Sequence, residues 1–268
     1  MNNGNRGNRE SGGNGRAPYL LLLGGSFNPP HIAHLRAALE AREALRPEKT
    51  LFIPASSPPH KPDARLLPFG LRVEMLKQTL APLPKEWELE VCEVENERRG
   101  PSYTADTLEI MAHRHQGKRL MFLLGAEDYA QFASWRHWAS MPRFADFVVV
   151  PRKNHGEDSF HSSTLSLWPK AKEQRLPLPD PPEEAADAPP SSPRLGYILP
   201  GGALILYLPL AMLEISSSLI RERFLSRLSL DFLIPPAVQA LIESEYHCIR
   251  KIWSSEYPFT HSGLLLNK

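Results

Sequence analysis

Short apolar runs alternate along this chain with stretches in which apolar residues recur every three or four positions. Runs of the first kind predict buried strands, and stretches of the second kind predict helices that pack on them. We expect strands at 19–23, 50–54, 87–94, 119–125, 145–151 and 203–208. We expect helices at 31–46 and 69–80, and further helices beginning near 104 and near 218. This alternation predicts an α/β fold with an open, mostly parallel sheet flanked by helices.

Three stretches depart from this pattern. Residues 1–17 are rich in Asn, Gly and Arg and lack apolar surface to bury, so we expect a disordered tail. Residues 177–193 contain seven prolines and four acidic residues without a basic one, which predicts a disordered insertion over about 154–196. The rest of 18–248 is expected to form one domain, followed by a C-terminal tail at 249–268.

The composition excludes several classes of protein. The formal net charge is +1 over 268 residues, which gives no electrostatic reason to expect binding to nucleic acid or to a membrane surface. No apolar run reaches the length of a transmembrane helix, and the first residues lack the apolar core of a signal peptide. Cys92 and Cys248 form no closely spaced pair, so we expect reduced thiols in a cytoplasmic protein.

Residues 24–35, Gly-Gly-Ser-Phe-Asn-Pro-Pro-His-Ile-Ala-His-Leu, connect the first predicted strand to the first predicted helix. Gly24 and Gly25 let the backbone approach a ligand closely. Free N–H groups and the helix dipole attract anions to a helix N-terminus. His31 and His34 share a helix face beside that position. Each feature alone is common in loops or packed helices, but their order directly after a strand predicts a phosphate site.

Polar candidates also follow the second, fourth and sixth predicted strands. Each has a plain structural reading: Lys61 as an exposed side chain, Trp135 as core, and the serines before Arg221 as helix caps. The carboxyl ends of parallel strands meet at one edge of a sheet, where ligands bind. We therefore expect one site that contains His31, His34, Lys61, Glu127, Asp128, Trp135, Ser217, Ser218 and Arg221.

This predicted site offers cations and backbone donors but no evident protein nucleophile. Such a site suits the direct transfer of a group from one phosphate to another. A terminal nucleotide phosphate is largely a dianion at pH 7, because its second pKa is about 6. Catalysis then requires alignment and stabilisation of negative charge. We expect His31, His34, Lys61 and Arg221 to provide it, together with Mg²⁺ that is held mainly by substrate phosphates. No protein metal ligand is predicted.

Residues 25–34 resemble the GTFDPPHxGH signature of nucleotidyltransferases with paired histidines, with Ser26, Asn28 and Ala33 as the differences. The Pro-Pro-His-Lys loop at 58–61, Ser-Tyr-Thr-Ala-Asp-Thr-Leu at 102–108 and Ile-Ser-Ser-Ser-Leu-Ile-Arg at 215–221 are similar to motifs of bacterial nicotinate-nucleotide adenylyltransferases. The resemblance covers about 19–247 apart from the insertion. It implies a Rossmann-like nucleotidyltransferase fold with a final helix at 235–246.

The resemblance also implies a reaction: AMP passes from ATP to nicotinate mononucleotide, giving deamido-NAD and pyrophosphate in NAD biosynthesis. It assigns catalytic roles to His31, His34, Lys61 and Arg221. For ATP it implies binding by Gly24, Gly25, Ser26, Phe27, His31, His34, Ser217, Ser218 and Arg221. For nicotinate mononucleotide it implies binding by Ser26, Lys61, Tyr103, Thr104, Trp135 and Glu127, with Trp135 stacked on the pyridine ring. Whether Glu127 or Asp128 takes the family's aspartate role is left open.

Other functions fit parts of this pattern. A sister transferase could use nicotinamide mononucleotide or another phosphorylated acceptor. A non-catalytic nucleotide sensor would fit if the residues at Asn28, Ala33 and Glu127 had disabled the chemistry. A class I tRNA synthetase shares the paired histidines, but 268 residues and the lack of a KMSKS-like loop argue against one. The sequence leaves open whether the chain forms a homo-oligomer.

Overall fold

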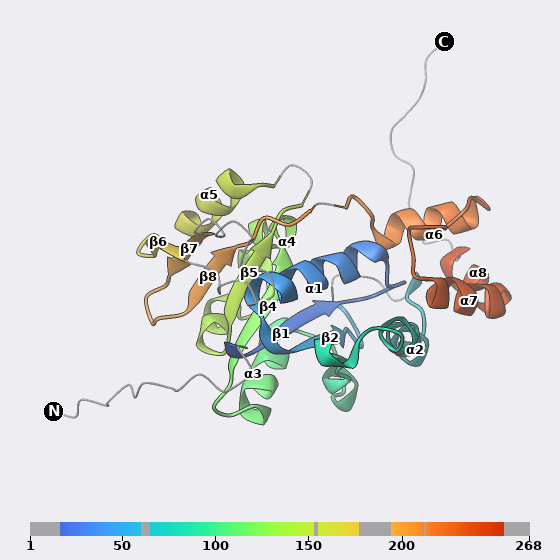
Figure 1. Ribbon diagram of the computed structural model, residues 1–268, viewed down its shortest axis with the longest axis horizontal. Coiled ribbons are helices and arrows are strands. Elements are labelled where there is room, and N and C mark those ends of the chain that lie inside the picture. Colours follow the sequence, from blue (N-terminus) through green and yellow to red (C-terminus); the bar gives the residue numbers. More distant parts are fainter. Residues whose placement is uncertain (1–16, 60–64, 153–154, 177–193, 212, 255–268) are drawn as a thin grey trace, which may run out of the picture.

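Eight strands of the described chain form one open sheet in the order β3-β2-β1-β4-β5-β8-β7-β6 (Figure 1). The computed structural model describes residues 17–59, 65–152, 155–176, 194–211 and 213–254. Neighbouring strands from β3 to β8 in this order run parallel, and β7 and β6 extend the sheet antiparallel. The strands are β1 (Ala17–Gly25), β2 (Pro47–Pro54), β3 (Leu89–Val91), β4 (Arg119–Gly125), β5 (Asp146–Val150), β6 (Lys172–Leu176), β7 (Arg194–Ile198) and β8 (Leu204–Tyr207).

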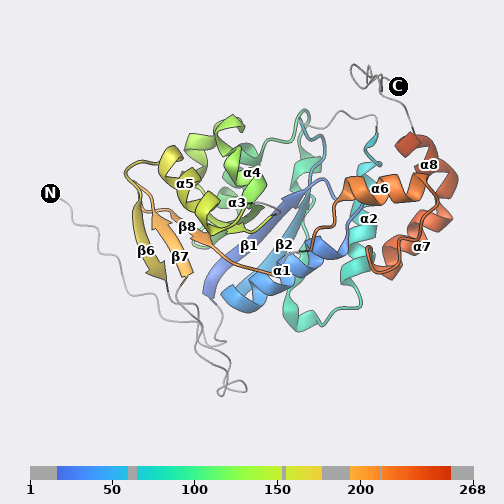
Figure 2. The same cartoon turned by 90° about the horizontal axis from the view of Figure 1, so that it is seen from above.

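Helices cover both faces of the sheet, with α1 on one face and α3 to α5 on the other (Figure 2). The α-helices are α1 (Ile32–Leu45), α2 (Phe69–Leu80), α3 (Thr104–Arg114), α4 (Ala126–Ala130), α5 (Glu157–Leu167), α6 (Ser217–Leu225), α7 (Pro236–Ser244) and α8 (Tyr246–Ser254). Short 3-10 helices are η2 (Lys85–Trp87), η3 (Val94–Glu97), η4 (Phe132–Ser134) and η5 (Trp138–Arg143).

The central strand β1 shows why the sheet needs helices on both faces. Leu20 and Leu22 belong to the hydrophobic cluster under α3 and α4, whereas Leu21 and Leu23 belong to the cluster under α1. Successive side chains of a strand point to opposite faces, so a continuous apolar run buries both. The predicted α/β fold with an open, mostly parallel sheet is confirmed. The third predicted strand is shorter than expected, because η2 and η3 flank it.

The segment predicted to be a disordered insertion is largely ordered. It contains α5, β6 and the first residues of β7. Phe160 of α5 is buried and packs on Tyr129, with 5.7 Å between the ring centroids, and Thr164 hydrogen-bonds the Tyr129 hydroxyl at 2.8 Å. The prediction was therefore wrong for 157–176 and 194–196, where side chains pack on the domain. Its proline-rich part, 177–193, lies outside the described residues.

The predicted ends of the domain also change. Helix α8 continues to Ser254, and Trp253 is fully buried against Phe224, with 5.0 Å between the ring centroids. The predicted C-terminal tail is therefore wrong for 249–254, and 255–268 lie outside the described residues. At the other end β1 already begins at Ala17, and the predicted tail at 1–16 is likewise outside them. A third cluster joins α6, α7 and α8 to α2.

Candidate functional site

A cavity of about 510 Å³ opens at the carboxyl ends of β1, β4 and β5. Its wall comes from the loop after β1, the start of α1, residues 65–66, the residues after β4 and β5, and residues 210, 211, 213, 216–218 and 221. This is the edge of the sheet at which the sequence predicted a site. Ten of the predicted site residues line it: Gly24, Gly25, Ser26, His31, His34, Asp128, Trp135, Ser217, Ser218 and Arg221.

The two glycines at the end of β1 keep the cavity open. A Cβ atom at Gly24 would lie 3.1 Å from the ring of Phe122, which itself lines the cavity. A Cβ atom at Gly25 would lie 3.3 Å from the ring of Phe27. Contacts this short require the rings to move, so larger residues at these positions would disturb the cavity wall.

The paired histidines are held against each other at the start of α1. Their rings stack with 3.6 Å between centroids and 22° between planes, and His31 is only 1% exposed. The backbone N–H of His31 donates to Nδ1 of His34 at 3.2 Å. Because Nδ1 accepts this bond, the proton of the neutral His34 ring lies on Nε2. His34 can therefore cap the helix with one nitrogen and donate with the other.

Phe27 lies beside the histidine pair. Its side chain is fully buried and is absent from the cavity wall. Its backbone is left-handed, with φ of 45°, and its ring meets His34 edge-on with 4.9 Å between centroids. The left-handed turn directs the ring inward. The ring of Phe27 thus supports the histidine pair, and the ATP contact predicted at Phe27 stays a prediction.

The start of α6 is hydrogen-bonded to the loop after β1. Ser216 caps the helix by accepting the N–H of Leu219 at 3.2 Å. Ser217 Oγ donates to the carbonyl of Pro29 at 2.9 Å. The Arg221 guanidinium donates to the Ser218 hydroxyl at 3.0 Å. Burial, and secondarily the charge of Arg65, lowers the pKa of Arg221.

The residues after β4 and β5 add aromatic and charged side chains to the wall. Trp135 packs on Phe132 with 5.4 Å between ring centroids. Asp128 lines the cavity, whereas Glu127 does not. Of the two carboxylates that the sequence left open, the structure brings Asp128 to the cavity wall, and the acceptor contact predicted for Glu127 stays a prediction. Arg152 also lines the cavity, and its Nη1 donates to the carbonyl of Leu213 at 3.2 Å.

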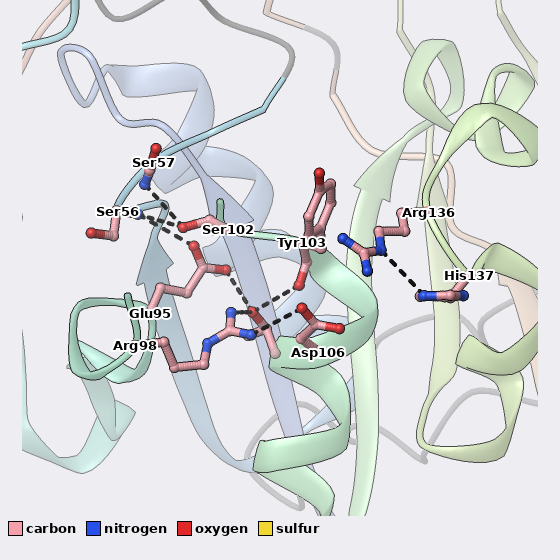
Figure 3. Close-up of polar contacts among 10 residues, drawn as sticks. Ser56, Ser57, Glu95, Arg98, Ser102, Tyr103, Asp106, Arg136 and His137 are labelled. Atoms are coloured by element: carbon pink, nitrogen blue, oxygen red, sulfur yellow. Dashed lines mark hydrogen bonds and ion pairs between the residues drawn. The ribbon is translucent and has the colours of Figure 1, made fainter. Parts of the chain in front are cut away.

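Three predicted residues remain: Lys61, Tyr103 and Thr104. Lys61 is outside the described residues. Tyr103 and Thr104 begin α3 and are not part of the cavity wall; the guanidinium of Arg136 lies 4.5 Å from the centre of the Tyr103 ring (Figure 3). Ser102 fixes this region to the segment after β2, because its hydroxyl accepts the N–H of Ser57 at 3.0 Å.

A buried carboxylate completes this polar cluster (Figure 3). One oxygen of Glu95 accepts the Ser56 N–H at 3.3 Å, and the other accepts the hydroxyl of Thr107 at 2.7 Å. Arg98 donates to the same hydroxyl at 3.0 Å and pairs with Asp106 at 3.3 Å. The cluster fixes the segment after β2 relative to the start of α3.

Sequence reasoning gave no site role to Arg72, which is fully buried in α2. Its guanidinium donates to the carbonyls of Ser26 at 2.7 Å and Leu67 at 2.9 Å. Burial lowers the pKa of Arg72 to about 10, and the negative charge of Glu95 acts in the opposite direction. The sequence feature that could have indicated the burial of Arg72 is its position four residues before Leu76, on the same face of the helix.

Three further observations concern the described residues. No three His, Cys, Asp or Glu side chains among them gather closely enough to hold a metal ion. None of the helices among them has the length and hydropathy that crossing a lipid bilayer requires. Cys92 and Cys248 are both free thiols.

Comparison with known proteins gives consistent matches. The family described as cytidylyltransferase-like matches residues 22–223. A probable nicotinate-nucleotide adenylyltransferase of Pelobacter propionicus is 33% identical over 84% of this chain and 95% of its own length. One of Trichlorobacter lovleyi is 34% identical over 83% and 95%. The nicotinic acid mononucleotide adenylyltransferase of Plasmodium falciparum, solved with NaAD, shares the fold with a TM-score of 0.62 at 16% identity, over 87% of this chain and 98% of its own.

Proposed function

The chain belongs to the cytidylyltransferase-like family and, within it, to the nicotinate-nucleotide adenylyltransferases, and from this premise we propose how its cavity performs the reaction. The enzyme transfers AMP from ATP to nicotinate mononucleotide, giving nicotinate adenine dinucleotide and pyrophosphate in NAD biosynthesis. The observation that carries this function is the match over nearly the full length of the relatives. The stacked histidines and the serine-capped start of α6, in one cavity, support it.

ATP is proposed to lie with its phosphates between the starts of α1 and α6. There the Nε2–H of His34, the hydroxyl of Ser218 and the guanidinium of Arg221 would all face phosphate oxygens. The backbone of Gly24 and Gly25 would lie against the nucleotide. These donors are fixed before substrate binds, so they stabilise the negative charge that develops on the α-phosphate and the leaving pyrophosphate. His31, whose ring stacks on that of His34, would contribute to the same stabilisation.

The phosphate of nicotinate mononucleotide is the attacking group. It needs no protein base, because it is largely ionised at pH 7. We propose that Trp135 stacks on the pyridine ring and that Ser26 and Lys61 contribute to the acceptor phosphate. The backbone at Tyr103 and Thr104 would meet the ring carboxylate. The protein's main contribution is then in-line alignment of the two phosphates.

Mg²⁺ is proposed to enter with ATP, because this ion commonly binds through substrate phosphates and water. It would neutralise charge on the transferred phosphates. The carboxylate in the cavity wall that could contact its water shell is Asp128. We also propose a cytoplasmic location, which accords with two free thiols.

Pyrophosphate release on mixing the protein with ATP, Mg²⁺ and nicotinate mononucleotide tests the function directly. The expected products are pyrophosphate and nicotinate adenine dinucleotide in equal amounts. A nucleotide sensor would instead bind ATP without releasing pyrophosphate. A transferase for another acceptor would release pyrophosphate only when that acceptor replaced nicotinate mononucleotide.

A further inference from the structure

Three arginines line the cavity: Arg152, whose guanidinium donates to the carbonyls of Leu213 and Ile215, and the pair Arg65 and Arg221. Arg221 was expected there, whereas Arg65, which follows the second strand, was not. The positive charge of Arg65 lowers the pKa of Arg221, in addition to the larger effect of burial. Two cations that face one cavity repel each other, and an anion between them would remove this repulsion. The pair therefore favours a ligand with more than one negative charge.

Asn28 holds both arginines in place. Its side-chain Nδ2 donates to the carbonyl of Arg65 at 2.7 Å, and its Oδ1 accepts the N–H of Leu67 at 3.0 Å. Its own backbone carbonyl accepts Nη1 of Arg221 at 2.8 Å. Asn28 is only 5% exposed, so these bonds are shielded from water. One residue thus fixes the segment that carries Arg65 and orients the guanidinium of Arg221.

The amide of Asn28 is chemically required for this arrangement. It donates to one backbone group and accepts from another, whereas an ionised carboxylate can only accept. An aspartate at position 28 would direct a negative oxygen at the carbonyl of Arg65. Residue 28 is one of the positions at which the sequence departs from the GTFDPPHxGH signature. The placement of Arg65 is therefore tied to a residue at which this chain departs from that signature.

We propose that Arg65 and Arg221 form a clamp for the terminal phosphates of the nucleoside triphosphate and for the pyrophosphate that leaves, and that Asn28 is its positioning residue. The identity of the ligand of this clamp rests on the proposed function. Guanidinium groups match phosphate oxygens in pairs and stay ionised, which suits a polyphosphate better than a single phosphate. Arg65 is exposed at the cavity rim, so it can meet the phosphates that project farthest from the reacting α-phosphate.

Isothermal titration of the full chain with sodium pyrophosphate and Mg²⁺ tests the clamp without turnover. Arg65→Ala should weaken pyrophosphate binding by about ten- to a hundredfold, because a charge-assisted hydrogen bond is lost. Arg65→Lys should recover part of the affinity. Arg143→Ala removes an exposed arginine that does not line the cavity and should bind as the wild type does. Affinity for nicotinate mononucleotide should stay within about twofold in all three variants.

A double-mutant cycle tests the positioning role. Asn28→Asp should weaken pyrophosphate binding, and adding it to Arg65→Ala should cause little further loss. The substituted side chain acts on the segment of Arg65, whereas the contact to Arg221 is made by the backbone carbonyl of residue 28, which the substitution keeps. Fully additive losses would overturn the role of Asn28. Wild-type pyrophosphate affinity in Arg65→Ala, or loss of affinity for nicotinate mononucleotide instead, would overturn the clamp.

Turnover by the wild type separates this inference from the proposed function. If the wild type releases pyrophosphate from ATP and nicotinate mononucleotide while Arg65→Ala binds pyrophosphate normally, the clamp alone is wrong. If pyrophosphate binding depends on Arg65 in a chain that does not turn over, the proposed function alone is wrong.

Discussion

Replacing His34 with asparagine separates the two tasks that the structure gives to this ring. Nδ1 of His34 accepts the N–H of His31 at 3.2 Å, which caps α1, while Nε2 carries the proton of the neutral ring and is the proposed donor to phosphate. The amide oxygen of asparagine lies at the same number of bonds from Cβ as Nδ1, so it can keep the cap. Asparagine has no atom that reaches the place of Nε2. Alanine loses both the acceptor and the donor.

The expected magnitudes differ for the two tasks. Losing a helix cap costs about 1 kcal/mol, which in a chain of this size lowers Tm by about 2–4 °C. Losing one donor to a transition-state oxyanion lowers kcat by about 10²–10³-fold. His34→Asn should therefore melt close to the wild type and lose about 10²-fold or more in kcat. His34→Ala should show the same loss in kcat and a lower Tm.

The assay combines pyrophosphate release under saturating ATP and nicotinate mononucleotide with thermal unfolding of each variant. His113→Asn, an exposed histidine in α3 that does not line the cavity, is the matched control and should change neither quantity. A folded His34→Asn variant with wild-type kcat would refute the donor role. A fall in Tm equal to that of His34→Ala would refute the capping argument.

Four further results are expected from steady-state kinetics and urea unfolding. Trp135→Ala should raise KM for nicotinate mononucleotide about tenfold and leave KM for ATP unchanged, because ring stacking contributes about 1–3 kcal/mol; an equal rise for both substrates would contradict the acceptor role. Nicotinate mononucleotide should be preferred over nicotinamide mononucleotide by about tenfold to a few hundredfold in kcat/KM, since an amide would leave a buried group unpaired; equal values would rule this out. Phe160→Ala should lower the free energy of unfolding by about 3–5 kcal/mol, whereas replacing 177–193 by a two-residue turn should change it little, because β6 and β7 already pair as neighbours. Burial raises the pKa of Asp146 above its ordinary 3.8, so the folded chain binds this proton more tightly than the unfolded chain. The free energy of unfolding should therefore fall as the pH rises from 3.8 through the raised pKa of the folded chain. Asp146→Asn should make this fall smaller.

The regular elements of the fold could be predicted where local pattern decides them. Helix α2 and strand β4 have the bounds that the sequence predicted, because each is an apolar pattern between clear breaks. Strand β6 could not be found this way. Its sequence, Lys-Glu-Gln-Arg-Leu, has no apolar alternation, and it is a strand because it pairs with β7. Helix α5 likewise depends on burying Phe160 and Thr164 against the domain.

The same division holds in the cavity. The histidines and the start of α6 lie in contiguous motifs, so the sequence alone predicts their chemistry and spacing. The inward turn of Phe27 depends on one left-handed residue, which no propensity indicates for phenylalanine. The place of Arg65 depends on a hydrogen bond to Asn28, 37 residues away. Such contacts arise only when two loops fold onto each other, so local pattern cannot reveal them.

Arg72 links the two loops that carry the proposed phosphate-binding residues. Its guanidinium binds the carbonyl of Ser26 in one loop and that of Leu67 in the other. Burying this cation is unfavourable, as its lowered pKa of about 10 indicates. The arrangement persists because backbone carbonyls replace the lost water. Loops fixed in this way lose little conformational entropy when substrate binds, so more of the binding free energy remains for aligning the reacting phosphates.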